Sequence, residues 1–175
     1  MFDQVFQDVK TNALDRWDYS PAYPSGFAGT PGPVVVEGFH WQHDDQIMAI
    51  MNLGQDTRAV VDIMVGASRD GLTRTFGDIY GQNMSNQASG TTLRLGKRYR
   101  VPLIIGCWVD QQMGGLSFAR KLASQVMGAM FYYRNRLTTI RHIDFLHNRE
   151  SFPDQAQLYT VDLLYEGDVF VTIDV

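Results

Sequence analysis

Residues 40–45, with the sequence His-Trp-Gln-His-Asp-Asp, carry nitrogen and oxygen donors of the kind that bind zinc. Side chains three residues apart lie together on a helix but point to opposite faces of a strand. Residues 34–40 have the composition of a strand, so His40 and His43 are poorly placed to share one ion. The other histidines, His142 and His147, are far away in the sequence. We therefore expect polar surface residues here and no bound metal.

Ser117 and Cys107 are candidate nucleophiles. Ser117 lies in Gly-Leu-Ser-Phe-Ala at 115–119, which begins a helix as a nucleophile elbow would, but alanine replaces the second glycine. A helix cap explains this serine, and no acid–histidine pair accompanies it at a recognisable spacing. Cys107 lies in the apolar run 101–109, which favours a buried, inert thiol. We predict no catalytic residue and no enzyme.

The segment 90–98, Gly-Thr-Thr-Leu-Arg-Leu-Gly-Lys-Arg, comes nearest to a phosphate-binding loop. A Walker loop has four residues between its glycines and a serine or threonine after the lysine to hold magnesium. Here five residues separate Gly90 from Gly96, and Arg98 follows Lys97. We therefore predict no nucleotide site and no cofactor.

The net charge of −4 is unevenly distributed along the 175 residues. Residues 1–89 carry −6, residues 90–141 carry +8 and residues 142–175 carry −6. Such asymmetry is typical of a nucleic-acid surface or of complementary patches for self-assembly, and it also occurs on two sides of a solvated monomer. Arginines alternate with aromatic residues at 98–100 and 132–136, but the sequence pI of about 5.4 argues against a dedicated nucleic-acid-binding protein.

Length and composition favour one globular domain over residues 1–175, with 45% apolar and 19% charged residues. No apolar run approaches the roughly 18 residues that span a bilayer, so no membrane partner is expected. Residues 1–8 contain acids where a signal peptide has a basic start, which favours an intracellular product.

The first half of the chain should position these residues on a short helix and several strands. We expect a helix at 2–17, a Pro/Gly-rich loop or arm at about 19–33 and a strand at 34–41. Asp70-Gly71 predicts a hairpin that pairs 58–66 with 72–80. Residues 81–92 are rich in polar residues and glycine, and we expect a flexible loop.

The second half predicts a central strand at 98–110, with Pro102 near its beginning, and a long amphipathic helix at about 117–136. A strand at 140–146 follows. From Tyr159 onward apolar residues occupy alternate positions, apart from Gly167, which predicts either one long bent strand or a hairpin with a three-residue loop. The fold class is α+β, with one mixed, mostly antiparallel sheet covered by the long helix.

The order strand, long amphipathic helix, short strand and closing strand is similar to that of tail-terminator and tail-completion (neck) proteins of tailed bacteriophages. The corresponding segments here are 99–109, 117–136, 139–146 and 158–163, the last with the sequence Leu-Tyr-Thr-Val-Asp-Leu. The resemblance covers less than half of the chain and lies in the order of elements and a few apolar positions. The first ninety residues have no counterpart in it.

The resemblance implies a structural virion protein, made in the host cytoplasm, that forms a ring at the head-proximal end of a tail. Such a ring, with six copies expected, ends tube growth and joins tail to head. Its partners would be itself, the tail tube protein and a head–tail connector, with DNA passing nearby through the lumen. Complementary charges then predict contacts between subunits, with these candidates: Arg134, Arg136, Arg141, Asp162, Glu166 and Asp168.

Two other classes of function remain open from the sequence. One is a different neck, connector or baseplate protein, or a non-viral assembly module. The other is a small soluble enzyme that uses His40, His43 or Ser117 on an unknown substrate.

Overall fold

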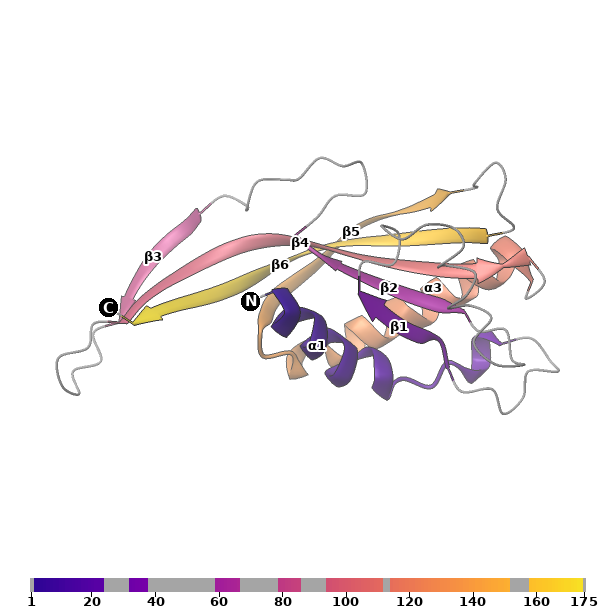
Figure 1. The fold of residues 1–175 in the computed structure, drawn as a ribbon, viewed down its shortest axis with the longest axis horizontal. Coiled ribbons are helices and arrows are strands. Elements are labelled where there is room, and N and C mark those ends of the chain that lie inside the picture. Colours follow the sequence, from indigo (N-terminus) through magenta and orange to yellow (C-terminus); the bar gives the residue numbers. More distant parts are fainter. Residues whose placement is uncertain are drawn as a thin grey trace.

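The computed structural model describes residues 2–23, 32–37, 59–66, 79–85, 94–111, 114–151 and 158–174. The strands are β1 (Val34–Glu37), β2 (Val60–Val65), β3 (Ile79–Ser85), β4 (Arg94–Asp110), β5 (Ile140–Ser151) and β6 (Leu158–Asp174). They form one six-stranded sheet in the order β1-β2-β4-β6-β5, with β3 paired to β4 (Figure 1). Only β1 and β2 pair in parallel within the described sheet, so the predicted mixed, mostly antiparallel sheet is confirmed.

The alternating segment near residue 175 forms one continuous strand rather than a hairpin. β6 pairs with β4 in an unbroken register from Arg94↔Asp174 to Asp110↔Leu158. Gly167 interrupts the apolar pattern because a β-carbon there would lie 2.5 Å from Cγ1 of Ile140, a fully buried residue. The glycine lets β5 approach β6 closely.

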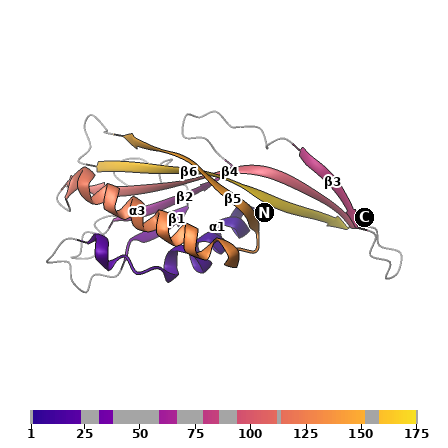
Figure 2. The same cartoon turned by 180° about the vertical axis from the view of Figure 1, so that it is seen from behind.

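Two helices cover one face of the sheet (Figures 1 and 2). The N-terminal helix α1 (Phe2–Asn12) is followed by the 3₁₀ turns η1 (Leu14–Arg16) and η2 (Ser20–Ala22), the latter inside the predicted loop at 19–33. The long helix α3 (Gly115–Tyr133) continues into the 3₁₀ turn η5 (Arg134–Arg136). Both predicted helices are therefore confirmed, with differences at their ends.

The main core lies between these helices and the odd-numbered residues of β6. On α3 the predicted stripe is buried at Phe118, Leu122, Val126, Ala129 and Met130, and it packs with Val161, Leu163 and Tyr165 in one cluster. Burying a large apolar side chain contributes about 1.5–3 kcal/mol. Met127, which the sequence places beside the stripe, is 36% exposed.

A buried carboxylate connects α1 to the start of β5. Asp8 accepts hydrogen bonds from the backbone N–H groups of Thr138 and Thr139, both 2.7 Å long, and from Asn12. Burial raises the pKa of Asp8, but these hydrogen bonds outweigh it and hold the pKa below its ordinary value. The ionised form therefore stabilises the attachment of α1.

The predicted hairpin between 58–66 and 72–80 is wrong for β2. Both edges of β2 are occupied, one by β1 and the other by β4. Ile79 and Tyr80 belong to β3, which pairs with β4, while residues 67–78 lie outside the described part. β3 also corrects the predicted loop at 81–92, since residues 81–85 are strand; 86–92 lie outside the described part.

Pro102 lies in the middle of β4 rather than near its beginning. Its carbonyl accepts a hydrogen bond from the N–H of Gly66, just beyond the end of β2. The N and C=O of one strand residue point to the same side, so the missing N–H faces β2 and not β6. On that side the neighbour of β4 changes at this point, from β3, which pairs at Tyr99, to β2, which pairs at Leu103. The proline therefore removes no hydrogen bond between β4 and β6.

Three strands extend beyond the helix-covered body as an arm, which we define as residues 79–85, 94–99 and 170–174 (Figure 1). In this arm β4 pairs only with β3 and β6 among the described strands, because β2 reaches only as far as Leu103 and β5 as far as Val169. At about 3.4 Å per residue, the six β4 residues of the arm span roughly 20 Å. Strand edges that lie outside a covered body are places where another chain can pair.

Candidate functional site

Strand β5 forms one edge of the sheet, and two irregularities shape it. Its register to β6 shifts between Arg141 and Asp144 and again between Phe145 and His147, so β5 carries an extra residue at each place. At the first bulge His142 has a φ of +48°, a left-handed conformation that is uncommon for a residue other than glycine. Such bulges redirect side chains and bend the strand.

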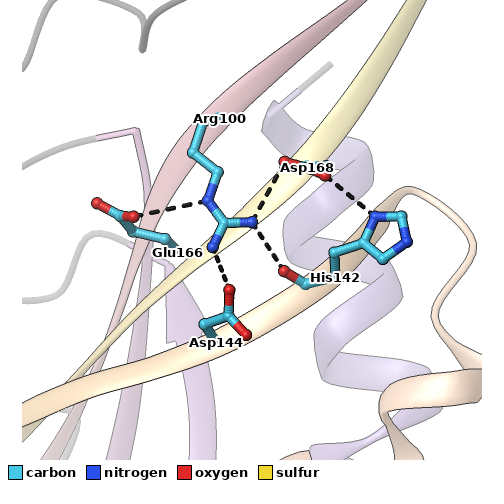
Figure 3. A network of polar contacts seen from close by, with 5 residues as sticks. All are labelled: Arg100, His142, Asp144, Glu166 and Asp168. Carbon is cyan, nitrogen blue, oxygen red and sulfur yellow. Dashed lines mark hydrogen bonds and ion pairs between the residues drawn. The ribbon is translucent and has the colours of Figure 1, made fainter. Parts of the chain in front are cut away.

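Arg100 of β4 holds the first bulge in place (Figure 3). Its guanidinium forms ion pairs with Asp144, with Asp168 at 3.2 Å and with Glu166 at 3.5 Å. It also donates a 2.9 Å hydrogen bond to the carbonyl of His142, whose Nδ1 lies 3.0 Å from Asp168. Burial lowers the pKa of Arg100, but the hydrogen bonds to Asp144 and Asp168 raise it overall. This network joins β4, β5 and β6 and is structural.

An open groove of about 720 Å³ lies beside the bulge, between the end of α3 and β5. Its positive charge comes from Arg134 and Arg141, both of which are exposed. No carboxylate in the described part of the chain forms an ion pair with either arginine, whereas Arg100 and Arg120 are both paired. Asp144 also lines the groove, but its charge is shared with Arg100. The groove is therefore suited to an anionic partner.

Apolar side chains continue this surface. A smaller pocket of about 260 Å³ shares Arg134 with the groove and is also lined by Met127, Phe131 and Phe145. Phe131 is 68% exposed and Phe145 is 42% exposed. The guanidinium of Arg134 lies 4.4 Å from the centre of the Phe131 ring, which is a cation–π contact. We call these residues, with Arg141, the β5-edge surface.

The structure separates the six predicted subunit-contact residues into two groups. Arg134, Arg136 and Arg141 are exposed, and the first and last of them line the groove. Asp162 and Asp168 are only 2% and 5% exposed, and Glu166 is half-buried beside Arg100. The arginines are therefore accessible to a neighbouring subunit, and the acids of β6 face their own subunit.

The residues considered for catalysis do not come together. Ser117 is exposed in the first turn of α3, where Gly114 is the N-cap and no side chain caps the helix, so the predicted serine cap is wrong. Cys107 is fully buried, and burial raises the pKa of its thiol. His40 and His43 lie outside the described residues. Within the described ranges no His, Cys, Asp and Glu side chains cluster as metal ligands.

Sequence reasoning missed the apolar half of the β5-edge surface and the role of Arg100. Met127, Phe131 and Arg134 recur at helical spacing next to the core stripe, which is the signal of a second exposed face. Phe145 follows the bulge, and bulges leave little trace in a sequence. No helix in the described part of the chain has the length and apolar character of a membrane span.

The chain was compared with protein-family models and with curated proteins. No protein-family model matches the chain, and no curated protein has a significant match to it.

Proposed function

We propose that this chain is a structural assembly protein that forms a ring at the head-proximal end of a phage tail, ends tube growth and joins the tail to the head. The observation that carries the proposal is the β5-edge surface. Exposed Phe131 and Phe145 lie close to Arg134, which lines the groove together with Arg141, and no carboxylate of the described residues forms an ion pair with either arginine. Apolar patches rimmed by charge are typical of protein–protein contact sites.

The arrangement of the sheet also supports a ring. The two outermost strands along the described β1-β2-β4-β6-β5 order, β1 and β5, are different in length and chemistry, so a contact between them would be heterologous. Heterologous contacts that repeat by rotation close into rings. The segments of the phage-protein resemblance correspond to β4, α3, β5 and β6, and they include α3 and β5, which carry most of the β5-edge surface.

The proposed partners follow from this role. They are other copies of the chain, the tail tube protein and a head–tail connector, in a virion tail or neck. The ring is proposed to act without a cofactor or catalysis, and packaged DNA passes through its lumen.

The proposal is tested by measuring the mass of the purified protein over a concentration series, with negative-stain imaging alone and with purified tail tubes. Closed rings of one size, free or at one end of the tubes, would support the proposal. A monomer at every concentration that also fails to bind tube ends would overturn it.

A further inference from the structure

The two edges of the sheet differ in charge. β5 is the outermost strand on one side and is exposed along most of its length, and its start lies beside Arg134 at the end of α3. β1 is the outermost described strand on the other side, and it ends at Glu37. The β5 edge is basic, as described above, so the charge of the β1 edge decides whether two copies can join edge to edge.

The β1 edge is acidic. Glu37 is exposed, and Asp3 is exposed in the first turn of α1. Partial burial raises the pKa of Glu37, and the nearby negative charges of Asp3 and Asp62 raise it further. No Lys or Arg of the described residues forms an ion pair with Glu37 or Asp3.

Elimination leads to the same two carboxylates. Outside the arm, the other exposed acids of the described residues already have partners. Asp15 pairs with Lys10 and Asp144 with Arg100, while Asp18 accepts a hydrogen bond from the N–H of Ser20. The half-buried Glu150 pairs with Arg120. The remaining acids outside the arm are buried or half-buried. Asp3 and Glu37 are therefore the described carboxylates best placed to meet a basic partner.

The strand directions allow the two edges to meet. β1 is parallel to β2, and two successive antiparallel pairings make β6 run in the same direction. β5 runs opposite to β6. When one copy is displaced sideways past another, the β1 of the second copy therefore lies antiparallel to the β5 of the first, which is a favourable relation for neighbouring strands. The registers place Glu37 level with Asn148, so the second copy must also shift along the strands by about five residues to bring Glu37 level with Arg141.

We propose that the β5 edge of one copy binds the β1 edge of the next, with Arg134 and Arg141 facing Glu37 and Asp3. This inference rests on the proposed ring and specifies its subunit contact. The occupant of the groove is thus a second copy of this chain, and each copy offers one basic and one acidic edge. Complementary charge steers the two edges together and fixes their orientation.

Charge reversal at each edge tests this contact. The basic-edge variant is Arg134→Glu with Arg141→Glu, and the acidic-edge variant is Asp3→Lys with Glu37→Lys. Each variant alone should lose rings at about 0.1 M salt, because its edges then carry the same charge. An equal mixture of the two should restore closed rings in which the variants alternate. The chain with all four changes should also form rings, because both edges are then reversed.

The matched control is Lys121→Glu with Arg136→Glu, which makes the same change in net charge at exposed residues that do not line the groove. This control should keep its rings. Thermal melting and native mass spectrometry establish that each variant is folded and report the composition of the mixed rings.

The outcomes separate this inference from the proposed function. Rings from wild type and from both edge variants would overturn the edge contact and leave the ring intact. Loss of rings in each variant without rescue in the mixture would also overturn the contact. Failure of the wild type to form rings, alone or on tail tubes, would instead overturn the proposed function.

Discussion

Arg100 and Asp168 lie opposite each other in the β4–β6 register, and Nη1 of the arginine is 3.2 Å from Oδ1 of the aspartate. The aspartate side chain is 7% exposed and the arginine side chain 20% exposed, so most of this pair is shielded from water. Removal of one partner would leave the other charge partly buried without compensation.

Arg100→Met should therefore lower the free energy of unfolding by about 2 kcal/mol or more. Urea unfolding followed by circular dichroism measures the change. Arg136→Met is the matched control, because Arg136 is exposed and forms no ion pair within the described residues, and it should change stability by less than about 0.5 kcal/mol. Equal effects of the two substitutions would show that the network adds no stability.

Asp8→Asn should destabilise the protein by about 2 kcal/mol at neutral pH. The reason is that the neutral amide is a poorer acceptor than the carboxylate for the backbone N–H groups of Thr138 and Thr139. The pKa of Asp8 in the folded protein lies below its ordinary value of 3.8. Its stabilising contribution is therefore complete above that ordinary value and is lost as pH falls through the lower, folded value. Unfolding curves of the variant and wild type should converge in acid. A difference that persists at the lowest pH would contradict this.

Gly167→Ala should be destabilising, because the added β-carbon would lie 2.5 Å from Cγ1 and 2.6 Å from Cδ1 of Ile140. Overpacking of this kind costs about 1–3 kcal/mol. Ile140→Ala alone opens a cavity and should cost about 2–5 kcal/mol. The double variant should lose less than the sum of the two, since each change relieves the other, and a double-mutant cycle measures that coupling. Simple additivity would show that the cost of the added β-carbon does not come from its contact with Ile140.

Phe131 and Tyr132 form a matched pair of neighbours on α3, with 68% and 67% exposure. Phe131 belongs to the β5-edge surface, whereas the ring of Tyr132 makes a tilted contact with Trp17, 6.2 Å between centroids. Phe131→Ser should weaken ring formation at least tenfold in concentration, as loss of a central apolar contact does, and Tyr132→Ser should leave it nearly unchanged. Sedimentation over a dilution series compares them. Equal weakening by both substitutions would contradict the assignment of the β5-edge surface.

The local periodicity of the sequence predicted where most helices and strands lie, but it did not predict correctly which distant strands pair. The α3 stripe from Phe118 to Met130 and the alternation in β6 are periodic signals, because each reports one buried face. The Asp70-Gly71 signal describes only a local turn, and it could not reveal that β1 and β4 occupy both edges of β2. Strand order depends on contacts far apart in the sequence.

Charge patterning located only half of the candidate site. Arg134 and Arg141 could be recognised as exposed cations, since α3 ends and β5 begins near them. Asp162 and Asp168 could not be recognised as buried from a sequence in which acids alternate with apolar residues. That pattern usually indicates a solvated face, and here the second face of β6 is also largely covered.

The position of β6 between β4 and β5 also has a consequence for synthesis on the ribosome. β4 and β5 do not pair with each other and meet only through β6, so the sheet stays incomplete until residues 158–169 have emerged. Until then the apolar stripe of α3 lacks Val161, Leu163 and Tyr165. The nascent chain therefore exposes apolar surface until residues 158–169 have been synthesised, and the helices and the sheet reach their native packing only after that.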